Sequence, residues 1–203
     1  MKIKEWIKFF KQHNNKKIFS FSDLLQLTTY NRQTLYVELN RLTKQGIINR
    51  ITREWYENPF NPPTKEEIAM ILRYPCYLSM EYALSKHGIL SQTVYTLTLV
   101  TTKTPYTYKT RNTTYEYHQI KKEFFWGYNK KDDILIAEPE KALIDLIHIR
   151  YRSKNREEKL FSLTRDLYIE ELNHEKLYKY AKKINKRIGK LVEMITHSPL
   201  SKT

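Results

Sequence analysis

A proline-rich segment at residues 57–64 is the feature that most constrains how this 203-residue chain can fold. It reads Glu-Asn-Pro-Phe-Asn-Pro-Pro-Thr. Proline has no backbone N–H and a fixed φ, so neither a helix nor an interior strand can continue through these residues. The chain is long enough for two small compact domains. We therefore expect one domain over residues 1–60 and a second over residues 64–203.

Three helix patterns and a hairpin pattern precede the proline-rich segment. The first helix has an apolar side formed by Trp6, Ile7, Phe9 and Phe10. The second, over residues 21–27, follows a Ser-x-x-Asp capping box that starts at Ser20 and can satisfy its free amides. Two short strands, over residues 47–51 and 54–56, are expected to form the hairpin, with its turn at Thr52-Arg53.

The third helix is the best defined of these elements. Asn31 is a good N-cap residue, and Gly46 stands where a left-handed residue ends a helix. Its buried stripe consists of leucines at i, i+4 and i+7, which are Leu35, Leu39 and Leu42. A helix–turn–helix followed by a hairpin predicts a winged helix-turn-helix domain.

Positive charge points to a polyanionic partner. The net charge is +14 and the isoelectric point is about 9.6. Residues 1–62 carry 11 Lys or Arg against 5 acids, and residues 151–203 carry 13 against 7. Residues 63–150 are nearly neutral, with 12 against 10. A surface this basic attracts nucleic acid or an anionic membrane, although a plain lysine-rich surface is the alternative.

The sequence favours nucleic acid over a membrane. No apolar run approaches the roughly 20 residues that a membrane-spanning helix needs. The first residues are charged at helical spacing and do not read as a signal peptide. We expect a cytoplasmic protein that has no membrane partner.

Polar residues near the start of the third helix suit the recognition of DNA bases. With the leucines turned inward, five side chains point elsewhere: Arg32, Gln33, Thr34, Tyr36 and Asn40. Arginine can bind guanine, and glutamine or asparagine can bind adenine, in the major groove. Thr34 and Tyr36 can reach a phosphate or a thymine methyl group. Since a helix-turn-helix inserts this helix into DNA, we expect double-stranded DNA as the ligand. A protein-binding winged helix with a solvated polar face is the alternative.

Further cations are candidates for phosphate contacts, which raise affinity without selecting sequence. Arg50 and Arg53 flank the predicted hairpin turn, where a wing meets the DNA backbone. Lys16 and Lys17 can extend the contact. For the lysines of the C-terminal tail, a solvated surface is the favoured interpretation.

Helix and strand patterns alternate over residues 64–203, which predicts a mixed α/β domain. Thr64 begins a helix that ends before Pro75, and Ser79 begins another that Gly88 closes. Alternation at residues 94–102 predicts a half-buried strand. Further strands are expected over residues 114–118, 124–128 and 134–137.

Two helical segments complete the predicted α+β fold. The first covers residues 140–151, with Pro139 in its first turn, and is apolar on several sides, so we expect it to be central. From about residue 155 the tail is expected to be helical. Asn173 is expected to cap one long helix with a seam formed by Leu177, Ala181, Ile184, Ile188, Leu191 and Ile195.

Catalytic and metal-binding patterns are weak. Metal-ligand spacing is absent from the six histidines, which stand at positions 13, 87, 118, 148, 174 and 197. The four glycines are too scattered for a phosphate-binding loop. Cys76 is the only cysteine and follows a proline in an apolar setting, so we expect a buried thiol.

A group of acids invites comparison with metal-dependent nucleases: Asp132, Asp133, Glu138 and Glu140, with Lys141. In that motif the last acid stands two places before the lysine, a position that Pro139 occupies here. Glu140 and Asp145 would lie about 140° apart on a helix and would not converge on one ion. We expect no metal, no cofactor and no enzymatic activity, with a nucleic-acid-processing enzyme as the least favoured alternative.

Several blocks of the second domain resemble a known family. Residues 74–88, Tyr-Pro-Cys-Tyr-Leu-Ser-Met-Glu-Tyr-Ala-Leu-Ser-Lys-His-Gly, resemble the opening of AbiEi-type antitoxin domains. Residues 136–146, Ile-Ala-Glu-Pro-Glu-Lys-Ala-Leu-Ile-Asp-Leu, are similar to that family's most specific signature. The resemblance covers about residues 1–150 in order, and the tail matches only in being helical.

The resemblance implies a function. AbiEi-type proteins are antitoxins of type IV toxin–antitoxin systems, linked to abortive phage infection, and their partner is a nucleotidyltransferase toxin that they neutralise typically without a stable complex. Their winged helix represses the operon by binding inverted repeats, which favour two copies on DNA. Glu140, Lys141 and Asp145 fall in the signature, and we interpret them as structural, through a helix cap and a buried charge pair. A stand-alone transcriptional regulator and a protein-binding scaffold are the alternatives.

Overall fold

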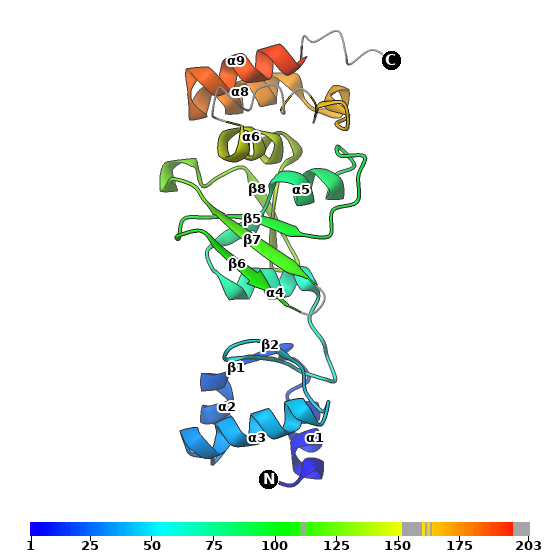
Figure 1. Ribbon diagram of the computed structural model, residues 1–203, viewed down its shortest axis with the longest axis vertical. Coiled ribbons are helices and arrows are strands. Elements are labelled where there is room, and N and C mark those ends of the chain that lie inside the picture. The colour runs from blue at the N-terminus through cyan, green and yellow to red at the C-terminus, as the bar shows by residue number, and fades with distance from the viewer. Residues whose placement is uncertain (111–112, 152–159, 161, 163, 197–203) are drawn as a thin grey trace. The chain divides into compact units, whose positions relative to one another are not determined.

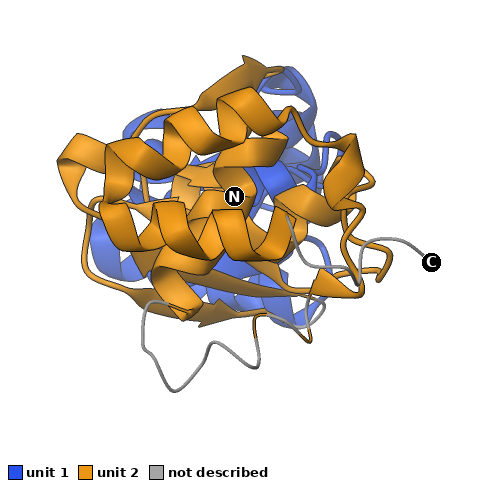
Figure 2. Ribbon diagram, turned by 90° about the horizontal axis from the view of Figure 1, so that it is seen from above, with its two compact units in different colours: residues 1–68 blue, residues 69–203 orange. Residues whose placement is uncertain are grey.

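The computed structural model describes residues 1–110, 113–151, 160, 162 and 164–196. The chain forms two compact units, Met1–Ile68 (unit 1) and Ala69–Thr203 (unit 2), which Figure 2 colours separately. Their boundary falls inside helix α4 (Lys65–Leu72), just beyond the proline-rich segment. In the part of the chain that is described, no helix is both long and apolar enough to cross a membrane.

Three helices and a small antiparallel sheet make up unit 1 (Figure 1). In chain order the elements are α1 (Ile3–Gln12), β1 (Ile18–Ser20), α2 (Phe21–Leu27), α3 (Arg32–Lys44), β2 (Arg50–Thr52) and β3 (Trp55–Glu57). The strand order is β1-β3-β2. The predicted helices are present, whereas β1 is an addition. The hairpin turn lies at Arg53-Glu54, one residue later than expected, and Glu54 adopts a positive φ of 70° there.

Local capping explains where the helices of unit 1 begin. The Ser20 hydroxyl accepts a hydrogen bond from the Asp23 amide at 3.0 Å, and the Asp23 carboxylate accepts one from the Ser20 amide at 2.7 Å. The Asn31 side chain accepts from the Thr34 amide at 2.9 Å and starts α3. Because these caps satisfy amides that a helix leaves free, they fix where α2 and α3 begin.

The proline-rich segment is attached to unit 1 through two asparagines. Asn58 is fully buried, and its side-chain amide donates to the carbonyls of Phe10, His13 and Lys16 at 3.0–3.2 Å. Asn61 donates to the Asn14 carbonyl at 2.7 Å. These bonds explain why unit 1 extends past the prolines.

Unit 2 is built on a mixed six-stranded sheet with the order β6-β7-β5-β4-β9-β8. Its strands are β4 (Cys76–Leu78), β5 (Leu97–Thr101), β6 (Tyr106–Lys109), β7 (Thr114–Gln119), β8 (Tyr128–Lys131) and β9 (Ile134–Ala137). Its α-helices beyond α4 that lie wholly within the described residues are α5 (Met80–Lys86), α6 (Pro139–Arg150), α8 (His174–Ile184) and α9 (Lys186–Thr196). The pairs β4–β9 and β5–β7 are parallel, and the other pairs are antiparallel.

Helices cover both faces of this sheet. On β7 the Tyr117 hydroxyl donates to the Ala69 carbonyl of α4 at 2.7 Å, while the neighbouring Glu116 pairs with Arg150 of α6 at 3.3 Å. Successive side chains of a strand point to opposite faces, so α4 and α6 lie on opposite sides. Figure 1 shows α8 and α9 stacked on α6, where they complete one continuous core.

Three predictions for unit 2 are corrected by the structure. Strand β5 is completely buried instead of half-buried, because helices cover both faces of the sheet; its Thr98 and Thr101 hydroxyls donate to backbone carbonyls at 2.7 Å. The strand expected at residues 124–128 begins only at Tyr128, since a 3-10 turn occupies Lys122–Phe124 and Gly127 has a φ of +76°.

The third correction concerns the tail, which forms two helices instead of one long one. Asn185 is extended between α8 and α9, and its side chain accepts from the Ile188 amide at 2.9 Å. It therefore starts a new helix where the sequence pattern runs on without a break. Residues 152–159, where the tail was expected to begin, lie outside the described residues.

Candidate nucleic-acid interface

Helix α3 has one completely buried side and one open side. Leu35, Leu39 and Leu42 have no exposed surface. The opposite side carries a stripe at i, i+4, i+7 and i+11, which we call the outer stripe: Gln33, Val37, Asn40 and Lys44. Asn40 is half-buried and the other three are exposed. The leucines hold the helix to its unit and leave the outer stripe to solvent.

A hollow of about 460 Å³ lies between the first half of α3 and the β2–β3 turn. Its lining comes entirely from unit 1: Phe21, Arg32, Gln33, Tyr36, Val37, Arg53, Glu54 and Tyr56. Four of the predicted site residues therefore meet here, namely Arg32, Gln33, Tyr36 and Arg53. The hollow combines two cations, one carboxylate, one amide and an apolar floor.

Arg32 is positioned at this hollow without being neutralised. Its guanidinium lies 5.4 Å from the Phe21 ring centroid and 3.8 Å from the Glu54 carboxylate. The side chain is 74% exposed, and an ion pair in that setting contributes at most about 1 kcal/mol. A phosphate or a base edge can displace Glu54 at little cost.

The other predicted contacts are distributed unevenly. Thr34 is exposed on α3, and Arg53 is exposed at the hairpin turn. Arg50 is half-buried, its Nε donates to the Thr52 carbonyl at 3.2 Å, and it does not line the hollow. Of these two arginines, only Arg53 lines the hollow.

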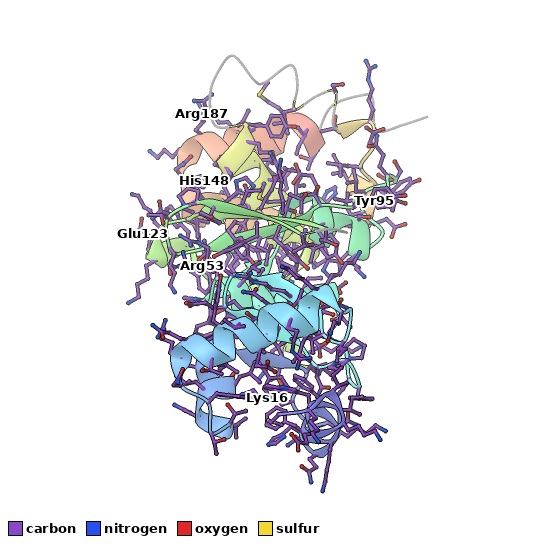
Figure 3. The ribbon with its side chains drawn as sticks, turned by 60° about the horizontal axis from the view of Figure 1, so that its bottom comes forward. Lys16, Arg53, Tyr95, Glu123, His148 and Arg187 are labelled. Carbon is purple, nitrogen blue, oxygen red and sulfur yellow. The ribbon has the colours of Figure 1, made fainter. Side chains whose placement is uncertain are left out.

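Lys16 and Lys17 lie apart from the hollow and are paired within unit 1. The Lys16 ammonium is 3.0 Å from Asp23, and the Lys17 ammonium is 2.6 Å from Glu67. Strand pairing places Ser20 opposite Trp55, next to the hairpin turn, and Ile18 opposite Glu57, away from it. Both lysines come just before Ile18 and therefore lie at the end of β1 that is farther from the hairpin turn. Figure 3 labels Lys16 and Arg53, which lie at separate places on the unit. The phosphate contacts expected of Lys16 and Lys17 stay a prediction.

Sequence reasoning missed Val37 and Lys44. Val37 is 64% exposed and Tyr36 is 51% exposed, although both are large apolar-bodied residues. The signal was present, because Gln33, Val37 and Asn40 have the same i, i+4, i+7 spacing as the leucines on the opposite side, and Lys44 follows Asn40 by one helical turn. Val37 was missed because only polar side chains were expected to contact DNA, and Lys44 because base contacts were expected near the start of the helix, whereas it stands in the last turn.

The signature residues of unit 2 form a buried network. Lys141 and Asp145 lie one helical turn apart on α6, their side chains are fully buried, and they are ion-paired. Asp145 also accepts from the hydroxyls of Tyr77 and Ser79 at 2.8 Å, and Lys141 donates to Tyr77 at 2.9 Å. Burial lowers the pKa of Lys141 against the opposing effect of Asp145, and burial raises the pKa of Tyr77 well above its usual value. The network joins α6 to β4.

Glu140 has a different structural role from the one expected. Instead of capping its own helix, its carboxylate accepts from the Asn173 amide at 3.1 Å and pairs with Lys176 at 3.2 Å. Both residues belong to the start of α8, where a negative charge is favourable. Glu140 therefore attaches the tail to α6.

The remaining chemical candidates are dispersed. Asp132 and Asp133 form the β8–β9 turn, whereas Glu138 is paired with Lys176 at 3.2 Å. Within the described ranges, no three His, Cys, Asp or Glu side chains gather closely enough to hold a metal ion, and His197 lies outside them. Cys76 is buried, as predicted, and burial raises its thiol pKa to about 12.

Comparisons with known proteins add no support to the resemblance to AbiEi-type antitoxins, which depends on the sequence motifs alone. No protein-family model matches this sequence, and the curated proteins give no significant match.

Proposed function

We propose that unit 1 is a winged helix-turn-helix that binds double-stranded DNA. In this assignment α2 and α3 are the helix-turn-helix pair, α3 is the recognition helix, and β2–β3 is a short wing. One observation carries the proposal: the open side of α3 and the wing turn face the same hollow and supply Arg32 and Arg53 to it. A helix of about 10–12 Å diameter fits a major groove about 12 Å wide.

The contacts divide into two kinds in this proposal. Arg32 and Gln33 stand in the first turn of α3, the part of a recognition helix that meets base edges. Arg53 is at the wing tip, where it meets the phosphate backbone. The net charge of +14 adds a sequence-independent attraction that salt weakens.

We further propose that the chain is an antitoxin that represses its own operon. This step rests on the AbiEi-like motifs of unit 2, since the geometry of the hollow bears only on DNA binding. The partner would be a nucleotidyltransferase toxin, and inverted repeats would bind two copies. A stand-alone regulator would share the DNA contacts and lack the toxin.

The DNA-binding proposal is tested with the full chain and the DNA upstream of its gene. The double variant Arg32→Ala plus Gln33→Ala should weaken the footprint about 100-fold, because two base contacts are lost. A control in unit 2, Lys122→Ala plus Gln119→Ala, also removes one cation and one amide and should bind normally. A footprint retained by the Arg32/Gln33 variant would rule out α3 as the reading helix.

The antitoxin step has its own test. The full chain is co-expressed with the nucleotidyltransferase encoded beside it. We expect the Arg32/Gln33 double variant to lose repression and still to rescue growth, since neutralisation is assigned to unit 2. A neighbouring gene of another class, or absence of rescue by the unaltered chain, would favour the stand-alone regulator.

A further inference from the structure

Val37 is the most exposed large aliphatic side chain among the residues that the structure describes. It stands in the middle of the outer stripe and lines the hollow. A β-branched residue lowers helix propensity, and here it gains no compensating burial. The fold of unit 1 therefore gives no reason for valine at this position.

The surroundings of Val37 indicate what it contacts. Gln33 precedes it by one helical turn, Asn40 follows by nearly one turn, and Arg32 and Arg53 line the same hollow. This surface is cationic at its edge and carries amides beside an apolar centre. In the DNA major groove, an A·T pair presents the adenine N6/N7 pair to an amide and, beside it, the apolar 5-methyl group of thymine.

We infer that Val37 packs against the 5-methyl group of a thymine, so that α3 selects duplexes with an A·T pair at that position. The inference rests on the proposed DNA-binding function. The flanking charges identify the occupant as a duplex, because an apolar protein surface would have to bury Arg53 and would leave Arg32 with only its weak pair to Glu54. Gln33 or Asn40 supplies the amide for an adjacent adenine.

Deoxyuridine provides a direct test, because it differs from thymidine in the DNA chain only by lacking this methyl group. The full chain is used to enrich a preferred duplex from a random pool, and each thymidine is then replaced singly. At one thymine in each half-site, replacement should weaken binding about fourfold, the value of one buried methyl group. Val37→Ala should bind the thymine and uracil duplexes equally at that position.

Arg53→Ala is the matched control. Its lost phosphate contact should weaken binding to both duplexes and leave the fourfold thymine preference intact. Val37 is exposed, so the alanine variant keeps the packed side of α3, and circular dichroism checks its helix content.

Each result has a defined meaning. The inference is overturned if no single replacement affects the unaltered chain, or if Val37→Ala keeps the same preference. If the chain enriches no duplex at all, the proposed DNA-binding function fails first and the inference with it. If the chain enriches a duplex but binds it equally well after every single replacement of thymidine by deoxyuridine, only the inference about Val37 is rejected and the proposed DNA-binding function stands.

Discussion

Positive charge is used in opposite ways in the two units. In unit 1, Arg32 and Arg53 line a hollow and are exposed to solvent. In unit 2, Lys141 has no exposed surface and donates to Asp145 and Tyr77. The comparison shows that a net charge of +14 says little about function until each cation is assigned a partner inside or outside the chain.

The two kinds of cation contribute differently to stability, because one kind is buried away from water and the other is exposed to it. Lys141 lies where charges are poorly solvated, with Asp145 as its counter-ion and the Trp126 ring centroid 4.9 Å from its ammonium. Removing one partner of such a pair leaves a buried charge without compensation. Arg32 keeps its water, so losing its weak pair with Glu54 has little effect on stability.

The largest expected effect is from Asp145→Ala. This change leaves the Lys141 ammonium buried and unpaired, and the free energy of unfolding of unit 2 should fall by about 3–5 kcal/mol. Urea unfolding followed by circular dichroism measures the change. The control Lys130→Ala, which removes the exposed Lys130–Asp133 pair, should leave the midpoint unchanged. Equal midpoints for both variants would show that the buried pair is not structural.

Gly127→Ala should have the next largest effect. Gly127 has a φ of +76°, and a Cβ there would lie 2.9 Å from Cγ of Lys141, which cannot move because both ends of its side chain are held. Strain and overpacking together should cost about 2–3 kcal/mol.

Gly88→Ala separates the two contributions to that cost. Gly88 has nearly the same φ, +75°, and a Cβ there would have nothing within 4 Å. Backbone strain alone should cost about 1 kcal/mol in this control. If the two alanine variants unfold at the same urea concentration, the close packing around Lys141 contributes nothing.

The smallest effect on stability is expected for Arg53→Ala in unit 1. The urea midpoint should not change, because Arg53 is exposed at the hairpin turn. DNA affinity should fall for all sequences, and the slope of log K against log salt should flatten by about one unit. An unchanged slope would show that Arg53 does not contact a phosphate.

Capping residues and the leucine stripe made most of unit 1 predictable. Ser20 and Asn31 begin helices where expected, because their side chains bond amides only three residues away. Strands β1, β4 and β6 were missed, since three or four residues establish alternation only weakly; β3 and β9 are equally short and were predicted. The Asn185 break was also missed, since apolar spacing continues across it and only the backbone conformation reveals the turn.

The candidate site was partly predictable. Arg32, Gln33, Tyr36 and Arg53 were identified from residue chemistry and meet at one hollow. The pairing of Lys17 with Glu67, 50 positions away, depends on the fold and left no local signal. Val37 was missed because only polar side chains were expected to contact DNA, although the leucine spacing already turned this valine outward.

The most direct test of the central claim is to map where a duplex touches the chain. In a titration with the preferred duplex followed by amide NMR shifts, the account predicts the largest changes at residues 32–37, 40, 44 and 53–54. Changes confined to the lysine-rich helices α8 and α9, with α3 unperturbed, would contradict it and transfer DNA binding to unit 2.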